Sequence, residues 1–150
     1  MEPVAMLELA SRALFDEGVS ALDDALLHFR GWQLFAKEYP LLEVGFQRNG
    51  VVSLRVRMRC DDWNDLPPSI EICDAQGALA TSMPQNLSGI LNLSAHPQTG
   101  KPFICMRGSR EYHTHPSHTT DAWASIKSND AFTLGGILTQ IWRAWQKVPA

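Results

Sequence analysis

Residues 94–123 contain most of the side chains in this sequence that are suited to chemistry. Four of the five histidines, one of the three cysteines and two carboxylates fall in this stretch. It is polar and interrupted by Pro and Gly, which is typical of a loop held on a rigid scaffold, where function tends to lie. The candidate residues are Cys105, Glu111, His113, His115 and His118.

A first interpretation makes Cys105 a nucleophile. A thiolate is favoured by nearby positive charge, and Lys101, Arg107 and Arg110 lie close to it in sequence, together with the histidines. Apolar residues flank Cys105 on both sides, which is equally typical of a thiol that only packs in a core. Both roles stay open for Cys105 at this level, whereas Cys60 and Cys73, in strand-like segments, are predicted to be buried.

A second interpretation makes Cys105, Glu111, His113 and His115 a metal site. If residues 111–115 are extended, Glu111, His113 and His115 at i, i+2 and i+4 project to one face. A turn after Cys105 then returns the thiol beside them. One sulfur, one oxygen and two nitrogen donors suit Zn²⁺ in a tetrahedral site, with His118 as a substitute for either histidine. A third interpretation is a polar loop with solvated histidines.

The N-terminal half predicts the elements that must position this segment. Apolar spacing predicts helix from Val4 to about Phe35, as two helices or as one helix kinked at Gly18. Alternating apolar residues over 42–58, interrupted by Asn49-Gly50, predict a β-hairpin. Residues 69–73 predict a third strand. These elements would form a scaffold of helices followed by an antiparallel meander.

The C-terminal half is less regular until its last helix. Residues 90–93 are a candidate fourth strand within a stretch punctuated by Pro, Asn, Ser and Gly. Residues 132–145 predict an amphipathic helix with N-cap candidates at 128–130, and Gly135-Gly136 predicts close approach of another backbone. The whole order predicts an α+β fold with N-terminal helix or helices, about four antiparallel strands, an irregular segment and a C-terminal helix.

Composition narrows the class of protein. The 150 residues, 45% hydrophobic and 19% charged, predict a single domain over residues 1–150. A net charge of -3 disfavours nucleic acid or an anionic membrane as partner. Three cysteines without a CxxC pair, and the absence of a leader or long apolar run, predict a cytoplasmic protein.

The arrangement of residues 96–141 resembles the ubiquitin-conjugating enzyme family. In that family a His-Pro-Asn element precedes the catalytic cysteine, and a Trp and an amphipathic helix follow. Here His96-Pro97-Gln98 precedes Cys105, and Trp123 and the helix at 134–141 follow. Leu66-Pro67-Pro68 is similar to the family's Pro-rich turn. The resemblance implies a UBC-like fold for most of the chain.

The resemblance also implies a role for each matched residue. Cys105 would accept the C-terminus of a ubiquitin-like protein as a thioester from an activating enzyme and pass it to an amine, without a cofactor. His96 would be structural. Gln98 replaces the family's oxyanion-stabilising asparagine and places its amide one methylene further out.

The set Cys105, Glu111, His113 and His115 is similar to the bacterial Cys-Glu-His-His proteins. Those proteins are predicted to bind metal and are encoded beside ubiquitin-like activating enzymes and deubiquitinase-like peptidases. In this chain the carboxylate and the two histidines would either deprotonate an incoming amine or hold Zn²⁺ with the thiol. The same side chains cannot do both at once.

Three functions therefore remain as expectations. The first is a bacterial conjugating enzyme of the ubiquitin-like type, whose partners are a ubiquitin-like protein and its activating enzyme. The second is a zinc-binding accessory protein of the same pathway. The third is a catalytically inert adaptor that uses exposed aromatics or the stripe Arg55, Arg57 and Arg59, which is also typical of a solvated sheet face.

Overall fold

The computed structural model describes residues 3–80, 90–92 and 95–147, and it has the predicted α+β architecture. In chain order its helices and strands are α1 (Pro3–Ser20), α2 (Asp24–Arg30), β1 (Trp32–Ala36), β2 (Leu41–Arg48), β3 (Val51–Arg59), β4 (Ser69–Cys73), β5 (Leu91–Asn92), β6 (Phe103–Ile104), α3 (Arg110–Thr114) and α4 (Leu134–Gln146). Three short 3₁₀ turns lie between α3 and α4, at Pro116–His118, Trp123–Ser125 and Asp130–Phe132.

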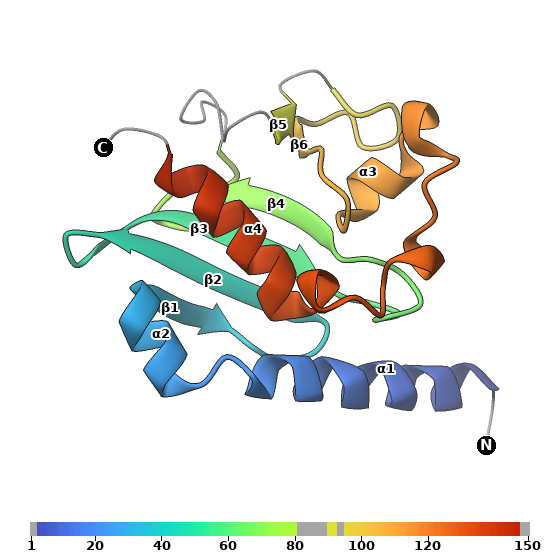
Figure 1. Cartoon of the computed structure of the whole chain (residues 1–150), viewed down its shortest axis with the longest axis horizontal. Helices are drawn as coiled ribbons and strands as arrows, with labels where there is room; N and C mark the ends of the chain where they lie inside the picture. The colour runs from blue at the N-terminus through green and yellow to red at the C-terminus, as the bar shows by residue number, and fades with distance from the viewer. Residues whose placement is uncertain (1–2, 81–89, 93–94, 148–150) are drawn as a thin grey trace.

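A four-stranded antiparallel sheet in the order β1-β2-β3-β4 forms the scaffold (Figure 1). The predicted hairpin is confirmed, because β2 and β3 meet at Asn49 and Gly50, whose φ angles are 54° and 77°. Positive φ at both central residues matches the right-handed twist of the flanking strands. The predicted strand at 69–73 is confirmed as β4.

The first strand of the sheet corrects the prediction of helix up to Phe35. Helix α2 ends at Gly31, which has a φ of 68° and donates its N–H to the carbonyls of the last turn. Trp32 then begins β1, which pairs with β2. The break between the two helices lies at residues 21–23 and not at Gly18, and Asp23 caps α2 by accepting from the Leu26 N–H.

The candidate fourth strand at 90–93 does not join the sheet. Leu91 and Asn92 form β5, which pairs with β6 in a separate two-stranded sheet, and Leu93 lies outside the described residues. The small sheet and α3 lie together at the β4 edge of the large sheet (Figure 1). The irregular segment is therefore built against one sheet edge.

Helix α4 covers one face of the large sheet and closes the core (Figure 1). The fully buried core side chains include Leu42 and Phe46 of β2, Val56 and Met58 of β3, and Ile137 and Ile141 of α4. Thr133 caps α4, not the predicted 128–130, by accepting from the Gly136 N–H. The predicted close approach is confirmed at Gly136, where an added Cβ would lie 2.5 Å from the Asp130 carbonyl oxygen.

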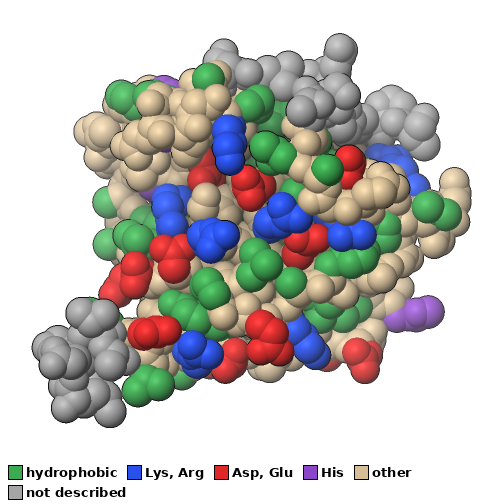
Figure 2. Space-filling model, turned by 180° about the vertical axis from the view of Figure 1, so that it is seen from behind, with side chains coloured by type: hydrophobic (Ala, Val, Ile, Leu, Met, Phe, Trp, Pro, Cys, Tyr) green, Lys and Arg blue, Asp and Glu red, His purple; other side chains and the backbone are tan. Residues whose placement is uncertain are grey.

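The opposite face of the sheet carries charges of both signs, interspersed with apolar side chains (Figure 2). Glu43 of β2 is buried there and accepts from Arg55 at 3.1 Å and from Arg57 at 2.7 Å. Arg55 also lies over the ring of Phe35, 3.6 Å from its centroid. Two arginines of the predicted stripe are thus engaged within the sheet itself.

Among the described residues, none of the helices has both the length and the apolar character that crossing a membrane requires.

Candidate active site

Cys105 is the partly exposed thiol of the three. It directly follows β6, and its N–H donates to the Ile90 carbonyl at 2.5 Å. Cys60 and Cys73 are buried, as predicted. Burial raises the pKa of Cys60 to about 12 and also raises that of Cys73. Because a buried, protonated thiol is inert, Cys105 is the thiol available for chemistry.

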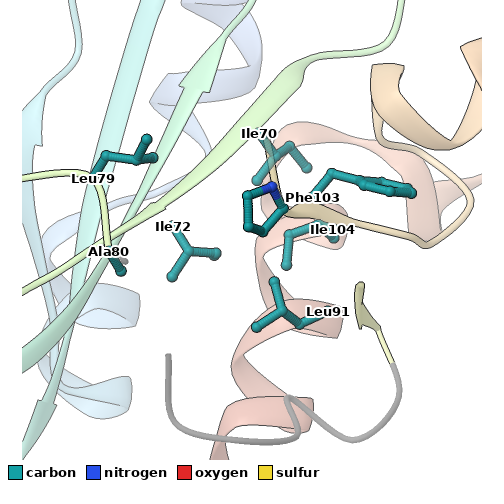
Figure 3. Close-up of a pocket in the computed structure, with 8 residues that line it drawn as sticks. Ile70, Ile72, Leu79, Ala80, Leu91, Phe103 and Ile104 are labelled. Carbon is teal, nitrogen blue, oxygen red and sulfur yellow. The ribbon is translucent and has the colours of Figure 1, made fainter. Parts of the chain in front are cut away.

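An apolar junction between β4 and the small sheet fixes the start of the Cys105 segment. Figure 3 shows the side chains at this junction, which come from β4, from the segment that follows it, and from β5 and β6; they are Ile70, Ile72, Leu79, Ala80, Leu91, Phe103 and Ile104. The space between them is about 20 Å³, enough for about one water molecule. This junction is packing that supports the site and has no room for a ligand.

His118 is the imidazole that meets the Cys105 thiol. Its Nε2 lies 3.8 Å from Cys105 Sγ. Helix α3 and the 3₁₀ turn at 116–118 bring it there, with the His118 N–H donating to the His115 carbonyl at 3.0 Å. Burial raises the pKa of the Cys105 thiol, so a base within reach of the S–H is what would release its thiolate.

Tyr112 contacts His118 of the Cys105–His118 pair, and Asp121 binds Tyr112 in turn. The Tyr112 ring stacks on His118 with the centroids 3.9 Å apart and the planes 16° from parallel. Its hydroxyl donates to Asp121 Oδ2 at 2.7 Å, which raises the pKa of Tyr112. Arg107 donates to both Asp121 oxygens at 3.0 and 3.3 Å. The Tyr112 and Arg107 hydrogen bonds lower the pKa of Asp121, which stays a carboxylate.

The extended conformation that the metal interpretation requires for residues 111–115 is not found, because residues 110–114 form helix α3 and only His115, its C-cap, is extended. Ser109 caps this helix by accepting from the Tyr112 N–H at 3.1 Å, a signal that was present in the sequence. In a helix the side chain at i+2 lies on a different face from those at i and i+4, so the three do not converge as they would in a strand. The helix therefore directs Glu111, His113 and His115 to different partners.

Glu111 points away from the thiol and into the sheet edge. It is 5% exposed and accepts from the Ile70 N–H at 2.9 Å and from the Ser69 hydroxyl at 2.5 Å. Burial raises the pKa of this carboxyl. Glu111 thus fastens α3 to β4 in this structure.

Both ring nitrogens of His113 bind the backbone. Nδ1 donates to the Asp121 carbonyl at 2.9 Å, and Nε2 accepts from the Gly108 N–H at 3.0 Å. Burial lowers the pKa of His113. A ring in this state cannot accept another proton or a metal ion without losing a backbone hydrogen bond.

His115 lies beside the site with one nitrogen engaged. Its Nδ1 accepts from the Ser117 N–H at 3.2 Å, with the Ser117 hydroxyl 2.7 Å away. Its ring stacks on Phe103 at 5.7 Å and lies 5.9 Å from His118. The structure therefore brings His118, and not the predicted pair of histidines, to Cys105.

Within the part of the chain that the structure describes, no three His, Cys, Asp or Glu side chains converge in a way that would hold a metal ion.

His96 braces the loop before the cysteine. It is 1% exposed, its Nε2 donates to the Glu111 carbonyl at 2.8 Å, and its Nδ1 accepts from the Gln98 N–H at 3.0 Å. Gln98 itself contributes its backbone to this contact, and it is exposed in the turn at 97–99. The Nε2 bond ties the loop at 95–101 to helix α3, and the Nδ1 bond holds the loop itself.

The cations near Cys105 in sequence have other partners. Lys101 pairs with Glu71 at 3.4 Å, and Arg110 pairs with Asp61 at 3.2 Å and donates to the Pro67 carbonyl. The pKa of Cys105 is set by burial. The thiol is therefore paired with an imidazole instead of lying among free positive charges.

Part of the chain has relatives among known proteins. A Y4jH-like family model matches residues 75–148. The uncharacterized protein y4jH of Sinorhizobium fredii strain NGR234 is 37% identical over 49 residues, which are 33% of this chain and 24% of that protein. The chain thus matches about a quarter of that relative. The stretch similar to the Y4jH family includes Cys105, Tyr112, His118 and Asp121.

Proposed function

We propose that this protein carries an acyl group on Cys105 as a thioester and transfers it to an amine, as a conjugating enzyme of the ubiquitin-like type. The acyl group would be the C-terminus of a ubiquitin-like protein, received from an activating enzyme. The observation that carries the proposal is the partly exposed Cys105 thiol with His118 Nε2 at 3.8 Å.

Two further observations support this reading. The element order of helix, four-stranded meander, irregular segment and C-terminal helix agrees with the order that the resemblance implies. The His96-Pro97-Gln98 element lies before the thiol, with His96 buried and bonded at both ring nitrogens. A fold alone does not establish an activity, so the proposal depends on the thiol and its imidazole.

The chemistry has two balanced steps. In the first, His118 takes the Cys105 proton, the sulfur attacks the donor thioester carbonyl, a new C–S bond forms, and the donor thiolate leaves and is reprotonated. In the second, an amine attacks the Cys105 thioester, the C–N bond forms, the C–S bond breaks, and His118 takes the proton of the amine. Cys105 returns as the thiol.

The zinc alternative gains no support from the geometry. It needs Cys105, Glu111, His113 and His115 around one point, and Glu111 instead bonds β4 while His113 bonds two backbone groups. A site of this kind would require rearrangement of α3.

The test is formation of a thioester on the purified protein. Incubation with an activating enzyme, ATP and its ubiquitin-like protein is expected to give an adduct that a thiol reductant removes. A synthetic peptide thioester ending in Gly-Gly serves as a donor that needs no activating enzyme. Cys105→Ala is expected to abolish the adduct, and Cys105→Ser to give a reductant-resistant ester. Absence of a Cys105 adduct from both donors would refute the proposal.

A further inference from the structure

His118 lacks the support that a catalytic histidine usually has. In most thiol–imidazole pairs a third group bonds the second ring nitrogen and fixes the ring. Across residues 3–80, 90–92 and 95–147, no hydrogen bond reaches His118 Nδ1; the side-chain hydrogen bond of this ring is the one between Nε2 and Cys105 Sγ. Its orientation must come from packing.

The ring against which His118 packs is Tyr112. The two rings are nearly parallel, with centroids 3.9 Å apart, whereas the next ring, His115, is tilted at 5.9 Å. A face-to-face contact at this distance restricts rotation of the imidazole about its χ2 angle, because turning it would drive ring atoms into Tyr112. In this stacked orientation, the edge of the His118 ring that carries Nε2 faces Cys105 Sγ.

Tyr112 is itself held at both ends. Its N–H donates to the Ser109 hydroxyl that caps α3, which fixes the backbone. Its hydroxyl donates to Asp121 Oδ2, and Arg107 holds Asp121 from the other side. The His113 ring is nearly perpendicular to the Tyr112 ring, with the two centroids 4.9 Å apart. This ring is therefore a fixed surface, although its side chain is only partly buried.

We infer that Tyr112 is a positioning residue whose ring holds the His118 imidazole with Nε2 directed at Cys105 Sγ, in the place of a hydrogen-bonding third group. The inference rests on the Cys105–His118 pair of the proposed function. It does not depend on the identity of the acyl donor.

The experiment is a double-mutant cycle on the reactivity of Cys105. Iodoacetamide alkylation of Cys105 at pH 7 is followed by mass spectrometry in the wild type, His118→Asn, Tyr112→Leu and the double variant, with buried Cys60 as the internal control. His118→Asn is expected to lower the rate by about tenfold or more. Tyr112→Leu is expected to reproduce that loss, and the double variant to lose nothing further. Tyr112→Phe, which retains the ring, is expected to recover most of the rate.

Each outcome tests one of two claims, namely the Cys105–His118 pair and the positioning role of Tyr112. If His118→Asn leaves the alkylation rate unchanged, the Cys105–His118 pair fails, and the role of Tyr112 fails with it. If His118→Asn slows alkylation but Tyr112→Leu does not, or if the two losses multiply in the double variant, the positioning role alone is overturned. Circular dichroism checks folding; if Tyr112→Leu does not fold, Tyr112→Gln takes its place in the same cycle.

Discussion

The two imidazoles His113 and His118 differ in what their nitrogens bind, and this difference decides which one is able to take a proton from the thiol. His113 donates from Nδ1 to the Asp121 carbonyl and accepts at Nε2 from the Gly108 N–H, so both of its ring nitrogens bind the backbone. His118 instead presents Nε2 to Cys105. A base must lie within reach of the proton that it removes, so His118 fits the role and His113 fits a structural one.

His113 should make stability depend on pH. Its folded pKa is lowered from 6.5 by burial, whereas the unfolded chain takes up the proton near 6.5. Protons therefore favour the unfolded state, and the free energy of unfolding should fall as the pH drops below about 6.5. Urea unfolding at pH 7.5, 6.5 and 5.5 measures this slope. In His113→Gln the slope should be smaller, and an equal slope in both proteins would contradict this assignment.

The pH dependence of stability that comes from Glu111 should have the opposite sign to that from His113. Its folded pKa is raised by burial, so the stability linked to its proton is present below pH 4.5 and is lost as the pH rises through the folded pKa. At pH 7, Glu111→Gln removes this cost and keeps an acceptor for the Ile70 N–H, so it should be at least as stable as the wild type. Glu111→Ala should lose about 1–3 kcal/mol, because a buried donor is left without a partner. Equal losses in chemical denaturation of the two variants would show that the charge itself is needed.

At this scale the sequence predicted which two thiols are buried but not which imidazole lies beside the third. The apolar strand context of Cys60 and Cys73 correctly predicted burial. His118 lies thirteen residues beyond Cys105, and the path between them includes a capped helix and a 3₁₀ turn. Spacing alone cannot show that the chain folds back to bring His118 beside Cys105. The prediction therefore had His118 only as a substitute for His113 or His115.

At the scale of elements, segments with a clear apolar period and a turn or cap signal were predicted well, and segments without both were not. The hairpin, β4 and α4 carry clear apolar periods with turn or cap signals. The residues of β1 continue the apolar spacing of α2, so they read as helix, since short apolar runs do not separate helix from strand. The sequence signal that α2 ends before β1 was Gly31, because glycine is typical of the position just beyond a helix end. Ser109 was the corresponding signal for α3.

The two glycines of α4 offer a matched pair of variants. A Cβ at Gly136 would lie 2.5 and 2.6 Å from the carbonyl oxygens of Asp130 and Ala131, which are backbone atoms that cannot move cheaply. A Cβ at Gly135 would meet the end of the Leu22 side chain at 3.3 Å. Gly136→Ala is therefore expected to destabilise by about 1–3 kcal/mol, within the range of overpacking.

Gly135→Ala is the control for that variant. Ala is favoured over Gly in a helix by about 1 kcal/mol, which offsets a small shift of Leu22. The stability of this variant should stay within about 1 kcal/mol of the wild type in thermal or urea unfolding. If both variants behave alike, the close backbone approach at Gly136 is not what constrains the start of α4.

At the scale of the whole molecule, the site is a layer attached to one edge of the large sheet, and it adds Ile104 and Met106 to the core. The core lies between the sheet and α4. The site layer, residues 95–118, is attached to the β4 edge by the Glu111 bonds, by Arg110, whose N–H donates to the Pro68 carbonyl, and by the β4–β6 junction. Because loops and the five-residue helix α3 make up most of the layer, it should open locally at lower free energy than the sheet.

A substitution at His96 tests whether the site layer opens at lower free energy than the sheet. Its two ring nitrogens satisfy the Glu111 carbonyl and the Gln98 N–H. His96→Ala removes both of these buried-ring hydrogen bonds at a cost of about 1–3 kcal/mol, so amide exchange in α3 and at Cys105 should speed up by about tenfold or more. The β2 and β3 ladder should change much less. Hydrogen exchange followed by mass spectrometry or NMR measures both regions.

Lys101→Ala in the same loop separates the effect of His96 from a general loosening. Lys101 makes an exposed ion pair with Glu71, and such pairs contribute about 0–1 kcal/mol. Exchange in α3 should therefore change by less than about fivefold in this variant. If His96→Ala instead accelerates exchange evenly over the sheet and α3, the layer unfolds together with the core. The thiol and its imidazole would then be positioned by the stability of the whole domain and not by the local brace.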